Sequence, residues 1–146
     1  NQLLEVFKLN INVSWAGEAL FVGETASGHK ILMDGPPEGG GHDLGPRPME
    51  MLLLGTGSCS SYDVISILKK SRQDVNACEV EISSTRADTE PKVFTDIHIH
   101  FKVTGKDLKE KQVERAVSLS AEKYCSASIM LGAIAKITHT FEIIDL

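Results

Sequence analysis

The residues from 47 to 70 read as one long helix without a polar face. Pro48 and Glu50 suit a first helical turn, because a helix start tolerates proline and its dipole favours an acidic group. Between residues 51 and 68 the only charged residue is Asp63. A helix that is apolar on every side is normally buried. At about 1.5 Å per residue this one is roughly 33 Å long, too long for a thin monomer to hide and too polar to span a membrane. We therefore expect a second copy of the chain to cover it, as an obligate homodimer.

Composition limits the remaining possibilities. With 146 residues, 42% of them hydrophobic and 24% charged, the chain suits one domain over residues 1–146 with its own core. A net charge of -5 without a basic cluster argues against nucleic acid as a partner. The three cysteines show neither a disulfide framework nor a zinc spacing, so neither metal nor cofactor is expected. The first residues lack a signal-peptide pattern, which favours a cytoplasmic location and no membrane partner.

The pattern of apolar residues predicts an α+β fold, because helices and hairpins are segregated along the chain. A Gly- and Pro-rich loop at 35–46 is predicted to hold no regular structure and to be mobile. A helix from Asp107 to Tyr124 is predicted to begin with a capping box that includes Glu110. The other expected elements are strands at 9–15, 20–24, 30–34, 77–86, 92–103 and 136–144, with a short helix at 126–135.

Two cysteines are candidates for chemistry. Cys125 lies at a predicted helix start, where backbone N–H groups lower the pKa of a thiol, whereas Cys59 is in mid-helix and needs a nearby cation. The alternative is that both are small core residues, and spacing alone favours that alternative. Cys78 begins a strand among apolar residues and is interpreted as core.

The histidines carry little signal. His98 and His100 have a spacing that can bind a metal, but they share a strand face with Asp96 and Lys102, so we interpret them as a solvated face. His139 lies on the apolar side of the last strand and is expected to be a core histidine with its hydrogen bonds satisfied.

Three motifs together resemble the OsmC/Ohr family of osmotically inducible and organic-hydroperoxide-resistance proteins. They are Pro48-x-Glu50-x-Leu52-Leu53, Gly55-Thr56-Gly57-Ser58-Cys59 and Ala121-Glu122-Lys123-Tyr124-Cys125-Ser126. Two further stretches, Ser-Ala-Glu-Lys-Tyr-Cys-Ser and Ile-Leu-Met-Asp-Gly, resemble the YhfA-like branch of that family. The resemblance implies an intertwined homodimer whose long central helices are buried between antiparallel sheets.

The resemblance also implies a function. Members of the family reduce organic hydroperoxides in the oxidative-stress response, so Cys59 corresponds to the peroxidatic cysteine and Cys125 to the resolving one, with a dithiol as reductant. Glu50 is the candidate for the family's catalytic glutamate, although Met49 occupies the position that matches it. The family's arginine has no counterpart in residues 1–46, where only Lys8 and Lys30 are cationic. We therefore expect slower catalysis than in the Arg-equipped members.

Two other functions remain open from the sequence. One is a dimer that binds a small apolar or thiol-carrying molecule with weak or no peroxidase activity. The other is a structural dimer in which the cysteines have no role. Turnover of an organic hydroperoxide with a dithiol separates the enzyme from both alternatives.

Overall fold

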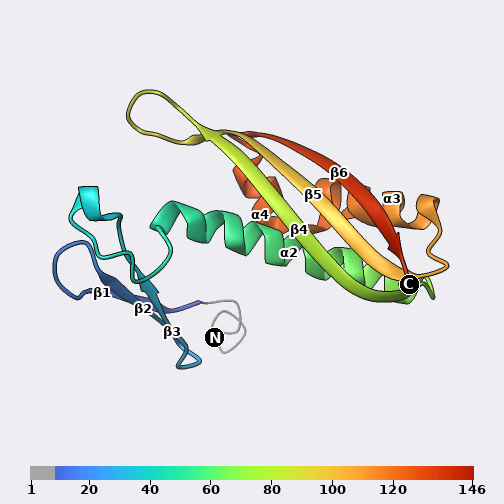
Figure 1. The fold of residues 1–146 in the computed structure, drawn as a ribbon, viewed down its shortest axis with the longest axis horizontal. Coiled ribbons are helices and arrows are strands. Elements are labelled where there is room, and N and C mark those ends of the chain that lie inside the picture. Colours follow the sequence, from blue (N-terminus) through green and yellow to red (C-terminus); the bar gives the residue numbers. More distant parts are fainter. Residues whose placement is uncertain (1–8) are drawn as a thin grey trace, which may run out of the picture. The chain divides into compact units, whose positions relative to one another are not determined.

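The computed structural model describes residues 9–146, drawn as a ribbon in Figure 1. Its contacts divide the chain into two compact units, residues 1–52 and 53–146, which are described separately below. The expectation of one domain stays a prediction.

The N-terminal unit contains the predicted meander of three strands. They are β1 (Ile11–Trp15), β2 (Phe21–Thr25) and β3 (Lys30–Met33), in antiparallel order β1-β2-β3. Gly28 lies in the turn between β2 and β3 with a φ of +87°, a conformation that side chains other than glycine rarely adopt.

The loop after β3 is organised around Asp34, a role that the sequence pattern did not reveal. The Asp34 side chain is only 1% exposed, and its carboxylate accepts hydrogen bonds from three backbone N–H groups of the loop. The donors are Gly35 at 2.8 Å, His42 at 3.0 Å and Leu44 at 3.1 Å. The loop also contains one 3₁₀ turn, η1 (Pro37–Gly39), so the prediction that it holds no regular structure is wrong there. Buried carboxylates need such partners, and these donors hold the loop against the end of β3.

The long helix α2 spans Pro48–Lys70, as predicted. Only one stripe of it is buried within the chain, since Leu54 is 57% and Tyr62 74% exposed. The expectation of burial on every side is therefore not met by the single chain. The helix also contains a window with a mean hydropathy of 1.3, which is long and apolar enough to cross a membrane. The prediction that the helix is too polar for a membrane span is therefore not supported. Core helices of water-soluble proteins have the same length and composition.

The C-terminal unit is built on a mixed sheet. Its strands are β4 (Asp74–Arg86), β5 (Phe94–Lys106) and β6 (Lys136–Asp145), in the order β4-β5-β6. The β4–β5 pair is antiparallel but β6 pairs parallel to β5, which corrects the expectation of purely antiparallel sheets. The physical reason is the connection: helices carry the chain back after β5, and a crossover of that length permits parallel pairing.

Three short helical segments form that connection. They are α3 (Glu110–Leu119), the π-helical turn η2 (Ser120–Tyr124) and α4 (Ser126–Leu131). The predicted capping box is wrong, because Asp107 adopts a left-handed conformation with φ of +52° and α3 begins only at Glu110. Both predicted helices are also shorter as α-helices than the sequence indicated.

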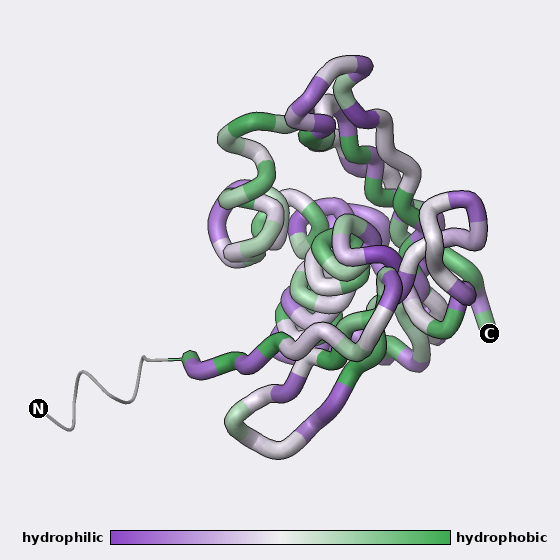
Figure 2. Tube along the Cα trace, turned by 90° about the vertical axis from the view of Figure 1, so that its left-hand side faces the viewer, coloured by the Kyte–Doolittle hydropathy of each residue, from purple (hydrophilic) through white to green (hydrophobic). Residues whose placement is uncertain are grey.

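The core of this unit lies between the sheet and the helices. The buried face of β5 presents Ile97, Ile99, Phe101 and Val103, and α2, α3 and α4 run along the sheet (Figure 1). Hydrophobic and hydrophilic residues are interspersed along the chain (Figure 2), and buried and more exposed positions alternate along β5. Helix α2 approaches β4 closely at Gly57, where an added Cβ would lie 3.0 Å from Ile82 Cδ1.

His139 differs from its expected role. Its ring stacks on Phe101 with centroids 6.2 Å apart, but its buried Nε2 has no hydrogen-bond partner among residues 9–146. Burial, and then the nearby His98, lowers the pKa of His139. The expectation of a fully satisfied core histidine is therefore wrong.

Candidate functional site

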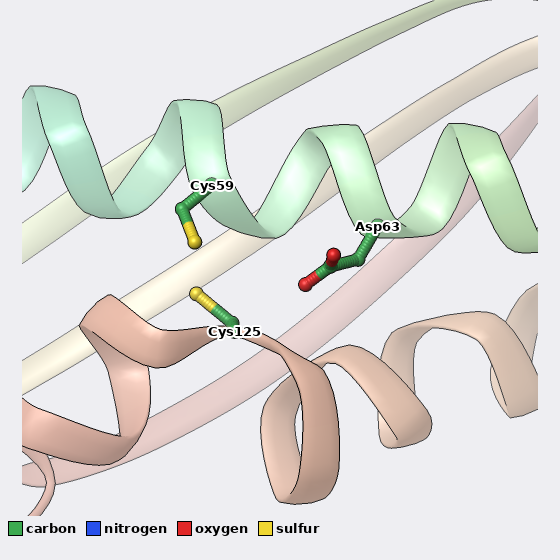
Figure 3. Close-up of side chains that lie close together, drawn as sticks. All are labelled: Cys59, Asp63 and Cys125. Carbon is green, nitrogen blue, oxygen red and sulfur yellow. The ribbon is translucent and has the colours of Figure 1, made fainter. Parts of the chain in front are cut away.

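The structure brings Cys59, Cys125 and Asp63 together in the C-terminal unit. The two sulfurs and a carboxylate oxygen of Asp63 all lie within 4.8 Å of one another. In Figure 3 the sulfurs of Cys59, on α2, and Cys125, before α4, point toward each other, and Asp63 lies one helical turn further along α2. Both cysteines are free thiols, Cys59 half-buried and Cys125 0% exposed.

Backbone geometry at the end of η2 fixes the position of Cys125. The chain leaves the π-helical turn and becomes extended at Cys125, with φ of −76° and ψ of 99°, before α4 begins. Cys125 is thereby the N-cap of α4, in place of the predicted Ser126, and its sulfur accepts the backbone N–H of Ser128 at 3.4 Å. Its own N–H donates to the Ser120 carbonyl at 2.8 Å.

Hydroxyl groups complete the surroundings of the Cys125 sulfur. Ser60 Oγ donates to Cys125 Sγ at 3.1 Å and lies 3.2 Å from Ser128 Oγ. Burial raises the pKa of Cys125, but hydrogen bonds from Ser128, Ser60 and Cys59 outweigh it, so the net pKa lies below the ordinary thiol value. The structure thus stabilises a thiolate on Cys125.

At Cys59 the influences that raise the pKa outweigh those that lower it. The backbone N–H of Ala127 lowers the pKa of Cys59, but burial, the hydrogen bond with Cys125 and the charges of Cys125 and Asp63 together raise it above the ordinary value. No Lys or Arg of the described residues is among the main influences on either thiol. The first proton lost by the pair therefore leaves a thiolate centred on Cys125, with Cys59 as its hydrogen-bond donor.

Asp63 is the residue that sequence reasoning missed. Its Oδ2 accepts a hydrogen bond from Ser120 Oγ at 3.1 Å, and the same hydroxyl lies 3.2 Å from the Ser60 carbonyl oxygen. A sequence signal existed, because Asp63 is the only charged residue in the apolar part of α2 and follows Cys59 by four residues, the spacing of neighbours on one helix face. Its proximity to Cys125 could not be known without the tertiary structure.

The other predicted candidates have local partners. Glu50, in the N-terminal unit, accepts the N–H of Arg47 at 2.8 Å and so caps the start of α2. Cys78, on β4, has a pKa raised mainly by burial and lies outside the cysteine cluster. Lys30 belongs to β3, and Lys8 lies outside the described residues. His98 and His100 hydrogen-bond to side chains of β6: Thr138, Thr140 and Glu142.

A groove adjoins the cluster. It has a volume of about 530 Å³, and Asp63 contributes to its wall. The exposed rings of Tyr62 and Tyr124 line it together with Ile67, and Arg115 adds a positive charge. Asp63 links the groove to the two sulfurs, but neither Cys59 nor Cys125 is among the residues that line the groove.

Comparisons with known proteins give consistent matches. The sequence model of the protein family described as OsmC-like protein matches residues 40–140 of this chain. Protein YhfA of Escherichia coli (strain K12) is 51% identical over 136 residues, which are 93% of this chain and 98% of that protein. The crystal structure of a hypothetical protein from Aquifex aeolicus VF5 superposes with a TM-score of 0.83 at 32% identity, covering 95% of this chain and 98% of that one. An organic hydroperoxide resistance protein OsmC from Legionella pneumophila has a TM-score of 0.73 at 16% identity, over 94% of this chain and 98% of that one, a likeness of fold alone.

Proposed function

Because this chain belongs to the OsmC-like protein family and resembles YhfA, as its motifs predicted, we propose that it is a thiol-dependent peroxidase that reduces organic hydroperoxides. The observation that carries the proposal is the approach of two free sulfurs, Cys59 and Cys125, to within 4.8 Å of each other. Two thiols at this separation can form a disulfide after a small movement, which a peroxidase with a resolving cysteine requires.

In the first step Cys59 is the nucleophile, because it is the more accessible of the two. The thiolate is the attacking species, and once the pair has lost one proton, Cys59 and Cys125 share the remaining proton through their hydrogen bond. Transfer of the Cys59 proton to Cys125 leaves Cys59 as the thiolate. Its sulfur attacks the terminal peroxide oxygen, the O–O bond breaks, and the leaving alkoxide takes the proton back from Cys125 as an alcohol.

In the second step Cys125 is the resolving thiolate. It attacks the sulfur of the Cys59 sulfenic acid, the S–O bond breaks, and hydroxide leaves to become water. The product is a Cys59–Cys125 disulfide, and the balance is one hydroperoxide and two thiols converted into one alcohol, one water and one disulfide. A dithiol of the lipoyl type then restores both thiols by exchange.

Hydrogen bonding favours the thiolate of Cys125, the resolving cysteine, and does not replace the family's arginine at Cys59. Ser60 and Ser128 stabilise the thiolate form of the pair, but they supply no positive charge and no donor to the peroxide oxygen. Preorganised donors of that kind are worth about 3 kcal/mol, or roughly a hundredfold in rate. We therefore propose slow turnover compared with Arg-equipped members.

The exposed face of α2 supports a homodimer as the working form. Leu54 and Tyr62 project from a helix whose other side packs in the core, and apolar surface of this kind is normally covered. A cytoplasmic location and a role in the oxidative-stress response are part of the same proposal.

Within residues 9–146 no Lys or Arg is among the main influences on the two thiols, which favours a second candidate function. In this alternative the dimer binds a small molecule in the groove beside Asp63, and peroxide turnover is weak or absent.

Stopped-flow oxidation by cumene hydroperoxide, followed by reduction with dihydrolipoamide, separates the two. For the peroxidase we expect Cys59→Ser to abolish oxidation and Cys125→Ser to stop at the sulfenic acid, with the matched control Cys78→Ser unaffected. Absence of any Cys59-dependent oxidation would reject the peroxidase and leave the binding protein.

A further inference from the structure

We propose that Cys59, Asp63 and Cys125 form a binding site for Zn²⁺. The site goes beyond the proposed peroxidase and does not depend on it. Each residue offers one ligand atom, and these three atoms lie within 4.8 Å of one another at a depth where Cys125 is fully buried. The sequence predicted no metal, because residues 59, 63 and 125 match no zinc spacing and only the tertiary fold unites them.

The distances suit a zinc ion with small adjustments. Zinc binds thiolate sulfur at about 2.3 Å and carboxylate oxygen at about 2.0–2.2 Å, in tetrahedral geometry. Ligand atoms around such an ion are therefore roughly 3.5–4 Å apart. The cluster is at most slightly wider than that, so rotation of the side chains is sufficient to close it. Three protein ligands leave the fourth position of a tetrahedral ion open to a solvent molecule, as in catalytic zinc sites.

The ligand types favour zinc over other metals. Two thiolates exclude magnesium and calcium, which prefer oxygen, and a carboxylate beside them is a poor ligand for the copper(I) that two thiolates alone would suit. Zinc accepts both kinds of ligand.

Hydrogen bonds already orient all three ligands. The backbone N–H of Ala127 points at the Cys59 sulfur and that of Ser128 at the Cys125 sulfur, where Ser60 donates a third bond. Ser120 Oγ holds Asp63 Oδ2 at 3.1 Å. Such outer partners fix ligand geometry in metal sites.

A bound cation would offset the charge of its own ligands. With both thiols ionised as ligands the site carries three negative charges, and within residues 9–146 Asp63 forms no ion pair with a Lys or Arg. Anionic groups gathered at a buried position require compensation, which a divalent ion provides. A bound ion would hold both sulfurs apart from each other as thiolates, so zinc and the Cys59–Cys125 disulfide exclude one another.

The test uses the reduced full-length protein, freed of metal with a chelator and then titrated with Co²⁺ as a spectroscopic substitute for Zn²⁺. We expect one ion per chain, with thiolate-to-cobalt charge-transfer bands and the intense visible bands of tetrahedral cobalt, all displaced by Zn²⁺. Asp63→Asn should weaken zinc binding by roughly tenfold or more. The matched control is Asp88→Asn, which removes a carboxylate elsewhere in the chain and should leave the affinity unchanged.

A second measurement needs no variant. Zinc should slow alkylation of Cys59 and Cys125 in the wild type, mapped by mass spectrometry, while Cys78 reacts at the same rate with and without the ion. Absence of the charge-transfer bands, equal affinity of Asp63→Asn and wild type, or equal alkylation of all three cysteines with and without zinc would each overturn the proposal. Since peroxide is absent throughout, a failure of the peroxidase activity leaves this result unaffected, and the reverse also holds.

Discussion

Replacing Ser60 with alanine should raise the pKa of Cys125 and slow the resolving step of the proposed peroxidase. The Ser60 hydroxyl is 1% exposed and donates to the Cys125 sulfur at 3.1 Å, so water cannot readily take its place. A hydrogen bond to a charged group contributes about 1.5–3 kcal/mol, and a change of 1 in pKa corresponds to about 1.36 kcal/mol. Loss of this bond is therefore expected to raise the pKa of Cys125, and the free-energy cost should lie toward the lower end of that range because Ser128 keeps its bonds to the same sulfur.

The assay is a titration of thiolate absorbance in the ultraviolet, in a Cys78→Ser background, together with stopped-flow oxidation. At pH values below the pKa of Cys125, a rise of 1 in that pKa should lower its thiolate fraction in Ser60→Ala about tenfold, and the rate of the resolving step, in which Cys125 attacks the Cys59 sulfenic acid, should fall equally. At a pH above both pKa values the two rates should converge. The matched control is Ser58→Ala, whose hydroxyl bonds only to the Leu54 carbonyl of the same helix. Superimposable titrations of Ser60→Ala and its parent, or an equal rise of the pKa in Ser58→Ala, would refute the reasoning.

Three further outcomes are expected. Backbone N–H groups hold the pKa of Asp34 below its ordinary value despite burial, so its contribution to stability is present above about pH 4 and is lost as pH falls through the lowered value. In urea unfolding between pH 7 and 3, the free energy of unfolding should therefore fall less in Asp34→Asn than in the wild type, whereas Asp88→Asn should behave like the wild type. Gly57→Val should lower the free energy of unfolding by about 1–3 kcal/mol, because even its Cβ would lie 3.0 Å from a side-chain methyl. Gly55→Val should cost less by chemical denaturation, because among the described residues its added Cβ would meet nothing within 4 Å beyond its chain neighbours and its own helix backbone. Leu54→Glu should convert the proposed dimer into a folded monomer in sedimentation equilibrium, and an unchanged dimer would place the interface elsewhere.

The fold was largely predictable where local pattern decides it. The alternation along β5 and the apolar length of α2 identified both elements correctly. Strands and helices each bury residues at a characteristic spacing, so the spacing of apolar residues indicates the element directly. The direction of β6 was not predictable in this way. Its alternation is the same whether it pairs parallel or antiparallel to β5, and only the path of α3 and α4 between the strands determines the choice.

The helix ends show a similar limit. Asp107 and Glu110 have the spacing of a capping box, but Asp107 enters a left-handed turn and the helix begins three residues later. A capping motif is a local preference, and the turn that follows β5 overrides it. The π-helical turn at 120–124 also leaves no pattern in the sequence, yet it sets the position of Cys125.

At the candidate site, the family resemblance identified the two cysteines but not the groups around them. Sequence reasoning looked for a cation to stabilise Cys59, since a thiolate in mid-helix has no other evident support. The structure instead supplies neutral donors, and it supplies them to Cys125. Neutral hydrogen bonds stabilise a thiolate without neutralising it, so the cluster of Cys59, Asp63 and Cys125 remains anionic when the pair ionises. The proposed metal ion and the proposed peroxide reduction both use Cys59 and Cys125, so the two would compete for the same sulfurs.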